Sequence, residues 1–162
     1  MGITGARLLY EDNTVQHAGV VIGYNGLAGH TFVGNEPDDV GYRAYVIQAR
    51  DYSAVTAACL MVKASLYDEV GGFEEELEVA FNDVDFCLKV REKGYLVVYN
   101  PYAVLYHYES KSRGYEDTPE KRNRFEKEAF FTYNKWEKIL ADGDPCYNPN
   151  LTLSNSDFSL RE

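Results

Sequence analysis

The chain has 162 residues, of which 45% are hydrophobic and 26% are charged, and its formal net charge is −10. This length and composition are those of one globular domain with its own core. So acidic a chain is a poor partner for nucleic acid, because a phosphate backbone attracts Lys and Arg, and no apolar run of about 18 residues is present that would span a membrane.

The three cysteines are odd in number and lack the CxxC spacing of a zinc site. This argues against a disulfide framework and a cysteine-bound metal, and it fits a reducing compartment. Cys59 and Cys87 lie in apolar runs and are expected to be core thiols. The 14 Tyr residues, against eight Phe and one Trp, suit a carbohydrate-binding or interface surface, or equally the wet boundary of a core.

Short apolar runs separated by turn residues predict strands in the first part of the chain. The expected strands cover residues 3–10, 15–23 and 54–63. Between the second and third, Gly, Asn, Asp and Pro recur over residues 24–52, which predicts a long surface loop with at most short structured pieces. The third strand should be buried, because it carries no charge before Lys63. Ser65 is then expected to cap a short helix that ends at the pair Gly71 and Gly72.

The segment NDVDFCLKVREKG carries the clearest helix signals. Asn82 or Asp83 would cap this helix, Gly94 would end it, and basic residues occupy its last turn. Two strands, YLVVY and AVLYHY, should follow, with Asn100 and Pro101 forming a turn between them. Strands and helices therefore alternate, which predicts an α/β domain with a mixed sheet flanked by helices.

A long helix is expected in the last third of the chain, with Thr118 as its N-cap and Pro119 as its first residue. Its predicted apolar face consists of Phe125, Ala129, Phe130, Tyr133, Trp136 and Ile139. The polar, turn-rich residues 141–162 are expected to form an extended arm that lies over the body formed by residues 1–140.

Asp83 and Asp85 are separated by one residue at the predicted helix start. Residues at i and i+2 of a helix point about 200° apart, so the two carboxylates cannot share a metal ion unless the segment is extended. We expect Asp85 to bond back to the helix start as a capping-box acid does, and Asp83 to face an open cleft. A helix N-terminus favours the ionised carboxylate that a general base requires. The simpler alternative, that both are capping residues, stays open at this point.

His107 lies on a predicted apolar strand, where a histidine is more often a satisfied core residue than a ligand. It alternates with Glu109, so both side chains can face one side of the strand, which permits metal binding. A metal-dependent hydrolase that uses Asp83, Asp85 and His107 is therefore one hypothesis. The helix geometry and the lack of a second histidine motif both argue against it.

The ordered set GGF, NDVDFC, GY and PYAVLYHYES resembles the C-terminal, acceptor-side half of family 2 glycosyltransferases with the GT-A fold. The segments GARLLYEDNTVQHAGVVIG, ESKSRGYEDTPEKRNRFEKE and DPCYNPNLT are similar to O-antigen-type and rhamnosyltransferase-like bacterial members. The resemblance implies a partial, Rossmann-like GT-A domain from an enzyme of cell-envelope polysaccharide biosynthesis. Such an enzyme transfers a sugar from a nucleotide-sugar donor to a glycan or lipid-linked acceptor, usually with inversion. The QxxRW element of processive synthases is absent, which argues for the addition of single sugars.

The resemblance also assigns roles on the acceptor side. Asp83 matches the family's general base, which deprotonates the acceptor hydroxyl as it attacks the anomeric carbon. Asn82 stands where Glu or Asp is commoner, which makes this element less acidic but leaves the base in place. Gly71, Gly72 and Phe73 match the loop that frames the acceptor site, so these three residues and Asn82 are the implied acceptor-binding residues.

On the donor side, His107 matches a histidine that reaches the metal or the diphosphate in some GT-A enzymes. Arg113 is a candidate, from its charge alone, for neutralising the leaving diphosphate. GT-A enzymes also carry an N-terminal nucleotide-binding half that ends in an Asp-x-Asp metal motif, and nothing before Ile3 supplies it. We therefore expect a divalent metal, Mg²⁺ or Mn²⁺, in the complete enzyme, whereas the isolated chain should hold an incomplete donor site and be inactive.

The missing half implies further expectations. A sheet edge and an apolar face left uncovered would favour a homodimer. The complete protein would act in the cytoplasm, at the inner face of the membrane, and it would not bind nucleic acid. The alternative hypothesis is a non-catalytic carbohydrate- or partner-binding module derived from a glycosyltransferase.

Overall fold

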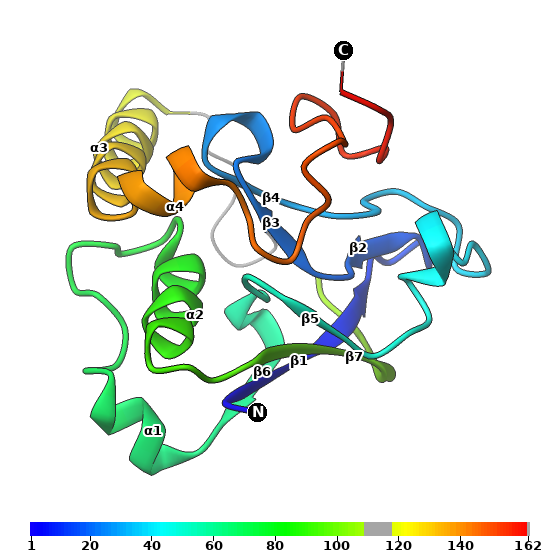
Figure 1. Cartoon of the computed structure of the whole chain (residues 1–162), viewed down its shortest axis with the longest axis horizontal. Coiled ribbons are helices and arrows are strands. Elements are labelled where there is room, and N and C mark those ends of the chain that lie inside the picture. The colour runs from blue at the N-terminus through cyan, green and yellow to red at the C-terminus, as the bar shows by residue number, and fades with distance from the viewer. Residues whose placement is uncertain (109–117, 162) are drawn as a thin grey trace.

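The structure, a computed structural model, describes residues 1–108 and 118–161 (Figure 1). Its strands are β1 (Ile3–Leu9), β2 (Val15–His17), β3 (Val20–Ile22), β4 (Ala28–His30), β5 (Arg50–Tyr52), β6 (Leu60–Val62) and β7 (Val97–Tyr106). Its α-helices are α1 (Ala64–Glu69), α2 (Asn82–Glu92), α3 (Pro119–Lys135) and α4 (Glu137–Asp142). Short 3-10 helices are η1 (Tyr24–Gly26), η2 (Tyr42–Ala44) and η3 (Ala57–Cys59).

A mixed five-stranded sheet is built around β1. Along one edge β1 pairs in parallel with β7, which in turn pairs antiparallel with β5. Along its other edge β1 pairs antiparallel with β6 near its start and with β2 near its end. Helices α1 and α2 lie on one side of this sheet, with α3 and α4 beyond the start of α2 (Figure 1). The predicted α/β class with a mixed sheet is therefore confirmed.

The prediction of one strand over residues 15–23 is wrong. The chain forms two strands there, because Gly19 interrupts the run with a φ of 111°. A side chain at Gly19 would place its Cβ 2.4 Å from the ring of Tyr52, so only glycine fits this close approach. After the interruption, β3 leaves the main sheet and pairs antiparallel with β4 in a separate two-stranded sheet.

The buried strand predicted over residues 54–63 is also wrong. Residues 54–56 are buried, and Ala54 forms an isolated β-bridge with Val20, but the strand of the main sheet is confined to β6. Met61 of β6 is 72% exposed, because the strand lies at the sheet edge. The preceding residues form η3, which begins where the Thr56 hydroxyl accepts a hydrogen bond from the N–H of Ala58 (3.3 Å). Cys59 is therefore half-buried, whereas Cys87 is a core thiol as predicted, and burial raises its pKa to about 12.

The turn predicted at Asn100 and Pro101 does not exist, since β7 runs through it as one strand. Ala6 of β1 pairs with Asn100, but the next residue, Arg7, pairs with Val104. The intervening residues bulge out of the ladder, and a bulge is one of the few places within a sheet where proline is tolerated. The bulge shifts the register of the last part of β7 against β1.

The helix ends follow the predictions more closely than the helix starts. Glycines with positive φ follow α1 and α2, as expected: Gly71, Gly72 and Gly94. Ser65, however, lies inside α1 and does not cap it. The residue before α2 is Phe81, in the left-handed region at φ 61°, so neither Asn82 nor Asp83 is the N-cap.

Helix α3 begins as predicted, with the Thr118 hydroxyl accepting from the N–H of Lys121 (3.3 Å) and Pro119 in the first turn. Its predicted apolar face is only partly right: Trp136 is buried and Ile139 packs against the core, but Phe125, Phe130 and Tyr133 are exposed. The buried positions of the helix are instead Glu128 and Thr132. In the described ranges, no helix is long and apolar enough to cross a membrane.

The described residues after α4 pack against the rest of the chain as an irregular arm. Asp144 accepts hydrogen bonds from the N–H of Ile22 (2.7 Å) and the hydroxyl of Ser53 (2.6 Å). Further along, the ring of Phe158 stacks on those of Phe32 and Tyr42, with centroids 4.7 and 5.1 Å away. These contacts tie the arm to β3 and to the connection between β4 and β5.

Candidate functional site

Asp83 lies in the first turn of α2, where backbone amides hold its carboxylate. The N–H of Ala57 donates to its Oδ2 (3.1 Å), and the N–H of Val84 donates to its Oδ1 (2.9 Å). The side chain is half-buried, and within the described part of the chain no Lys or Arg forms an ion pair with it. An anionic group in this position is stabilised by the positive end of the helix dipole. The carboxylate is therefore held in place without being neutralised, as a general base must be.

Asp85 does not bond back to the helix start, so its predicted capping-box role is wrong. The side chain is fully buried, and its Oδ1 accepts from the indole N–H of Trp136 (2.9 Å) and pairs with Lys135 (2.8 Å). Lys89 lies 3.4 Å from its other oxygen. Burial alone would lower the pKa of Lys135, but the hydrogen bonds to Asp85 and Glu74 raise it. Asp85 thus joins α2 to the end of α3 and has a structural role.

The two acids therefore contact different elements, as their spacing along a helix predicts. Asp83 contacts η3, and Asp85 contacts α3. Among the described residues, no group of three His, Cys, Asp or Glu side chains is placed to hold a metal ion. The described residues thus offer no ligand set for the divalent metal that the resemblance implies.

The predicted acceptor-binding residues lie at the two ends of the segment that joins α1 to α2. Gly71 is exposed, Gly72 is buried, and the partly exposed ring of Phe73 packs against Phe86, with centroids 4.9 Å apart. Asn82 is half-buried at the opposite end, as the first residue of α2. The structure therefore brings these residues onto one connection, at its two ends.

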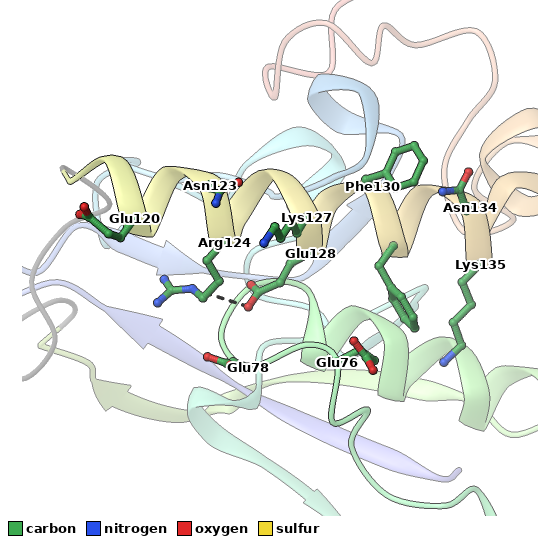
Figure 2. A pocket seen from close by; sticks show the side chains of 11 residues that line it. Glu76, Glu78, Glu120, Asn123, Arg124, Lys127, Glu128, Phe130, Asn134 and Lys135 are labelled. Carbon is green, nitrogen blue, oxygen red and sulfur yellow. Dashed lines mark ion pairs between the residues drawn. The ribbon is translucent and has the colours of Figure 1, made fainter.

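A groove of about 840 Å³, which the sequence did not indicate, lies between this segment and α3 (Figure 2). Glu76 and Glu78 of the segment line the groove together with residues of α3 that include Asn123, Lys127 and Phe130. Arg124, Glu128 and Lys135 extend from α3 toward the segment, whereas the ring of Phe130 projects from the opposite side of the helix (Figure 2). The ring of Phe130 is 71% exposed. Carboxylates and amides beside an open aromatic ring suit a ligand that carries both hydroxyls and apolar faces.

Glu128 fixes the width of this groove. It is buried, and its Oε2 accepts from the N–H of Ala80 (2.6 Å) while its Oε1 lies 3.6 Å from Nε of Arg124 (Figure 2). Phe81, which follows Ala80 in the segment, packs its ring against that of Phe125 in α3, with the ring centroids 5.5 Å apart. These contacts hold the segment against α3 three residues before Asp83. In the sequence, the charged, amide and aromatic residues of α3 look like an ordinary solvent-exposed helix face, so they gave no signal for the groove.

His107 directly follows β7 and continues its pairing with β1. Its N–H donates to the carbonyl of Leu9 (3.0 Å), and its ring Nδ1 lies 2.8 Å from Oε1 of Gln16. The imidazole is half-buried, so it is neither a fully enclosed core residue nor a free surface side chain. Arg113 and Glu109 lie outside the described residues.

No family model matches the chain. Over 161 residues, 99% of its length, it is 52% identical to the uncharacterized protein y4gI of Sinorhizobium fredii, of which it covers 18%. It is 35% identical to the O-antigen biosynthesis protein RfbC of Myxococcus xanthus over 165 aligned residues. This alignment covers 99% of this chain and 12% of that protein. A 60-residue stretch, 37% of the chain, is 35% identical to an N-acetylglucosaminyl-diphospho-decaprenol L-rhamnosyltransferase of Mycobacterium tuberculosis, of which it covers 20%.

The chain thus spans a fifth or less of the length of these curated relatives. Two of these three relatives are named for bacterial polysaccharide biosynthesis or for a sugar transfer. The chain is therefore related to bacterial polysaccharide-biosynthesis proteins and, over part of its length, to a rhamnosyltransferase.

Proposed function

We propose that the chain is the acceptor-side half of a family 2 glycosyltransferase of the GT-A fold, and that Asp83 is its general base. The observation that carries the proposal is the placement of Asp83, whose carboxylate is held by two backbone amides at a helix start and, among the described residues, forms no ion pair with a Lys or Arg. The relation to an O-antigen biosynthesis protein and a rhamnosyltransferase supports it. The donor is a nucleotide-sugar, and the acceptor is a glycan or a lipid-linked glycan.

In the proposed reaction an acceptor hydroxyl attacks the anomeric carbon of the donor sugar. The new bond forms between the hydroxyl oxygen and this carbon, while the bond from the carbon to the diphosphate oxygen breaks. The hydroxyl proton passes to Asp83, and the nucleoside diphosphate leaves with the bonding electron pair. A single displacement of this kind inverts the anomeric configuration. The segment from Gly71 to Asn82 would frame the acceptor beside the base.

Sugar transfer by the longer protein that carries this chain tests the proposal. Purified protein is incubated with labelled nucleotide-sugars and a lipid-linked acceptor, and the labelled product is measured for wild type, Asp83→Asn and Asp68→Asn. Asp68 is a matched control, because it is an exposed acid on α1. We expect transfer by wild type and Asp68→Asn and its near loss in Asp83→Asn. Equal transfer by all three proteins would contradict the role of Asp83.

The groove beside α3 favours a second candidate function, a carbohydrate-binding module without catalysis. Its open ring and amides would bind a glycan even in the isolated chain. Titration of the 162-residue chain with bacterial polysaccharide, compared between wild type, Phe130→Ala and Asp83→Asn, separates the two functions. Binding that depends on Phe130 but not on Asp83, together with no transfer by the longer protein, would favour the module.

A further inference from the structure

Gln16 is a buried polar residue of β2 whose side chain reaches the residue after β7. It is only 3% exposed, and its amide Nε2 donates to the carbonyl oxygen of His107 (3.2 Å). Its Oε1 lies 2.8 Å from Nδ1 of the same histidine. One amide group therefore contacts both the backbone and the ring of a residue 91 positions away in the sequence.

A β-bulge directs Gln16 toward His107. Leu8 of β1 pairs with His17 and Leu9 pairs with Val15, so Gln16 is the extra residue, with no partner of its own in the β1–β2 ladder. Bulges redirect a side chain and are common beside functional sites. The backbone of His107 is also fixed, because its N–H donates to Leu9 at the same end of β1.

These two contacts determine which nitrogen of the His107 ring carries the proton. Nε2 of Gln16 donates to a carbonyl, so the oxygen of the same amide faces the ring. A carbonyl oxygen can only accept a hydrogen bond, so Nδ1 of His107 must be the protonated nitrogen. In the neutral ring, Nε2 then carries the lone pair, and this atom has no hydrogen-bond partner among the described residues.

We propose that Gln16 is a positioning residue, which fixes the ring of His107 in the Nδ1–H tautomer and so presents the Nε2 lone pair at the end of β7. This inference rests on the proposed function, in which His107 lies toward the donor. The neutral ring held in this way is an electron-pair donor, so it suits a hydroxyl hydrogen or a cation. It cannot donate a hydrogen bond from Nε2 to a diphosphate. Histidines that act through one ring nitrogen commonly have the other one fixed by such a partner.

The tautomer can be measured directly in the ¹⁵N-labelled chain by long-range ¹H–¹⁵N NMR at pH 8. The chain has only three histidines, so substitution of each to Asn assigns the spectrum. We expect Nδ1–H for His107 in wild type and in Gln16→Glu, which keeps an acceptor oxygen. Gln16→Met should release the ring into a mixture with the Nε2–H form, whereas Gln48→Met, at an exposed glutamine, should change nothing. An Nε2–H tautomer of His107 in the wild-type chain would overturn the proposal. This measurement is decisive even if none of the variants folds.

Kinetics of the longer protein test whether this fixed tautomer matters. Gln16→Met should lower kcat/KM by roughly 10–100-fold, the usual effect of losing a partner that orients a functional histidine. Gln16→Glu should restore part of the loss. A changed tautomer with unchanged kcat/KM would overturn the positioning role. If the wild-type protein transfers no sugar, the proposed function fails, and so does the role of Gln16 in that function. The NMR measurement still decides independently whether Gln16 sets the tautomer of His107.

Discussion

Asp83 and Asp85 differ in their contacts because the turn of α2 directs their side chains to different neighbours. Among the described residues, the hydrogen bonds to the Asp83 carboxylate come from backbone amides of η3 and of its own helix, and in the proposed function its charge serves the chemistry. Asp85 is buried, and its carboxylate pairs with Lys89 and Lys135 and accepts a hydrogen bond from Trp136. These contacts join α2 to the end of α3. The spacing of the two acids predicted that they diverge. It could not identify Lys135 and Trp136 as partners of Asp85, since these lie about fifty residues later in the chain.

Removing the charge of Asp85 should destabilise the fold. Asp85→Asn weakens the bonds to two ammonium groups and keeps an oxygen for the indole of Trp136, so we expect a loss of about 1.5–3 kcal/mol, the range for hydrogen bonds to charged groups. Urea unfolding measures the change. The control Asp68→Asn should stay within about 0.5 kcal/mol of wild type, as exposed substitutions do. Equal stabilities of the two variants would show that the buried contacts of Asp85 contribute nothing.

His17 should make the stability of the fold depend on pH. It is fully buried, and burial, with a smaller contribution from His30, lowers its pKa well below the ordinary value of 6.5. Below this pH the unfolded chain binds a proton that the folded chain excludes, so the free energy of unfolding falls as the pH falls, by up to about 1.4 kcal/mol per pH unit. The loss stops only when the pH reaches the lowered pKa of the folded state.

Urea unfolding at pH 7.5 and pH 5.5 measures this dependence. The variant His17→Gln cannot take up the proton but can still accept a hydrogen bond from the N–H of Thr56, as Nε2 of His17 does (3.4 Å). Its stability should therefore change less between the two pH values than that of wild type. The same change in both proteins would mean that His17 is not the titrating group.

At the scale of the elements, Gly19 separates β2 from β3 and so sends the chain from one sheet to the other. Gly19→Ala should destabilise the fold by roughly 1–3 kcal/mol more than Gly26→Ala, because an added Cβ at residue 19 meets the ring of Tyr52 at 2.4 Å. Gly26 is the matched control, since its φ of 88° is also positive but nothing lies within 4 Å of an added Cβ. Urea unfolding of both variants measures the difference. Equal decreases in the free energy of unfolding would mean that the ring of Tyr52 moves away from the added Cβ without destabilising the fold.

Local signals in the sequence were sufficient to place helix ends but not strand breaks. The glycines after α1 and α2, and Thr118 with Pro119 before α3, act through their own backbone conformations, so they can be identified without the rest of the fold. The break at Gly19 depends on Tyr52, and the bulge in β7 depends on its register against β1. Interactions of this kind join distant parts of the chain, so a local pattern cannot show them.

At the scale of the whole molecule, the described part of the C-terminal arm should unfold together with the body. Phe158 is buried between Phe32 and Tyr42, so Phe158→Ala should cost about 3–5 kcal/mol. The fluorescence of Trp136, the only tryptophan, reports unfolding of the body near α3. We expect its urea midpoint to fall in Phe158→Ala and to stay constant in Leu160→Ala, which changes an exposed residue of the arm. An unchanged midpoint in both variants would mean that the arm is an independent unit.

The sequence predicted only part of the candidate site, because the rest depends on contacts between residues that are far apart in the chain. The position of Asp83 at a helix start follows from the pattern around it. The groove beside α3 depends on Glu128, whose carboxylate holds a segment 48 residues earlier in the chain. The partner of His107 is likewise set by the pairing of β1 with both β2 and β7. Both features required the fold, because no residue near them in sequence indicates them.

The role of Asp83 as general base is the central claim, and steady-state kinetics of the longer protein test it most directly. In Asp83→Asn, kcat should fall by roughly 10²–10⁴-fold, which is what a positioned general base contributes. The affinity for the nucleotide-sugar should stay close to that of wild type, because the base contacts the acceptor. Near-normal kcat in Asp83→Asn, with turnover abolished in a still folded Asp85→Asn, would contradict the account and assign the chemistry to Asp85.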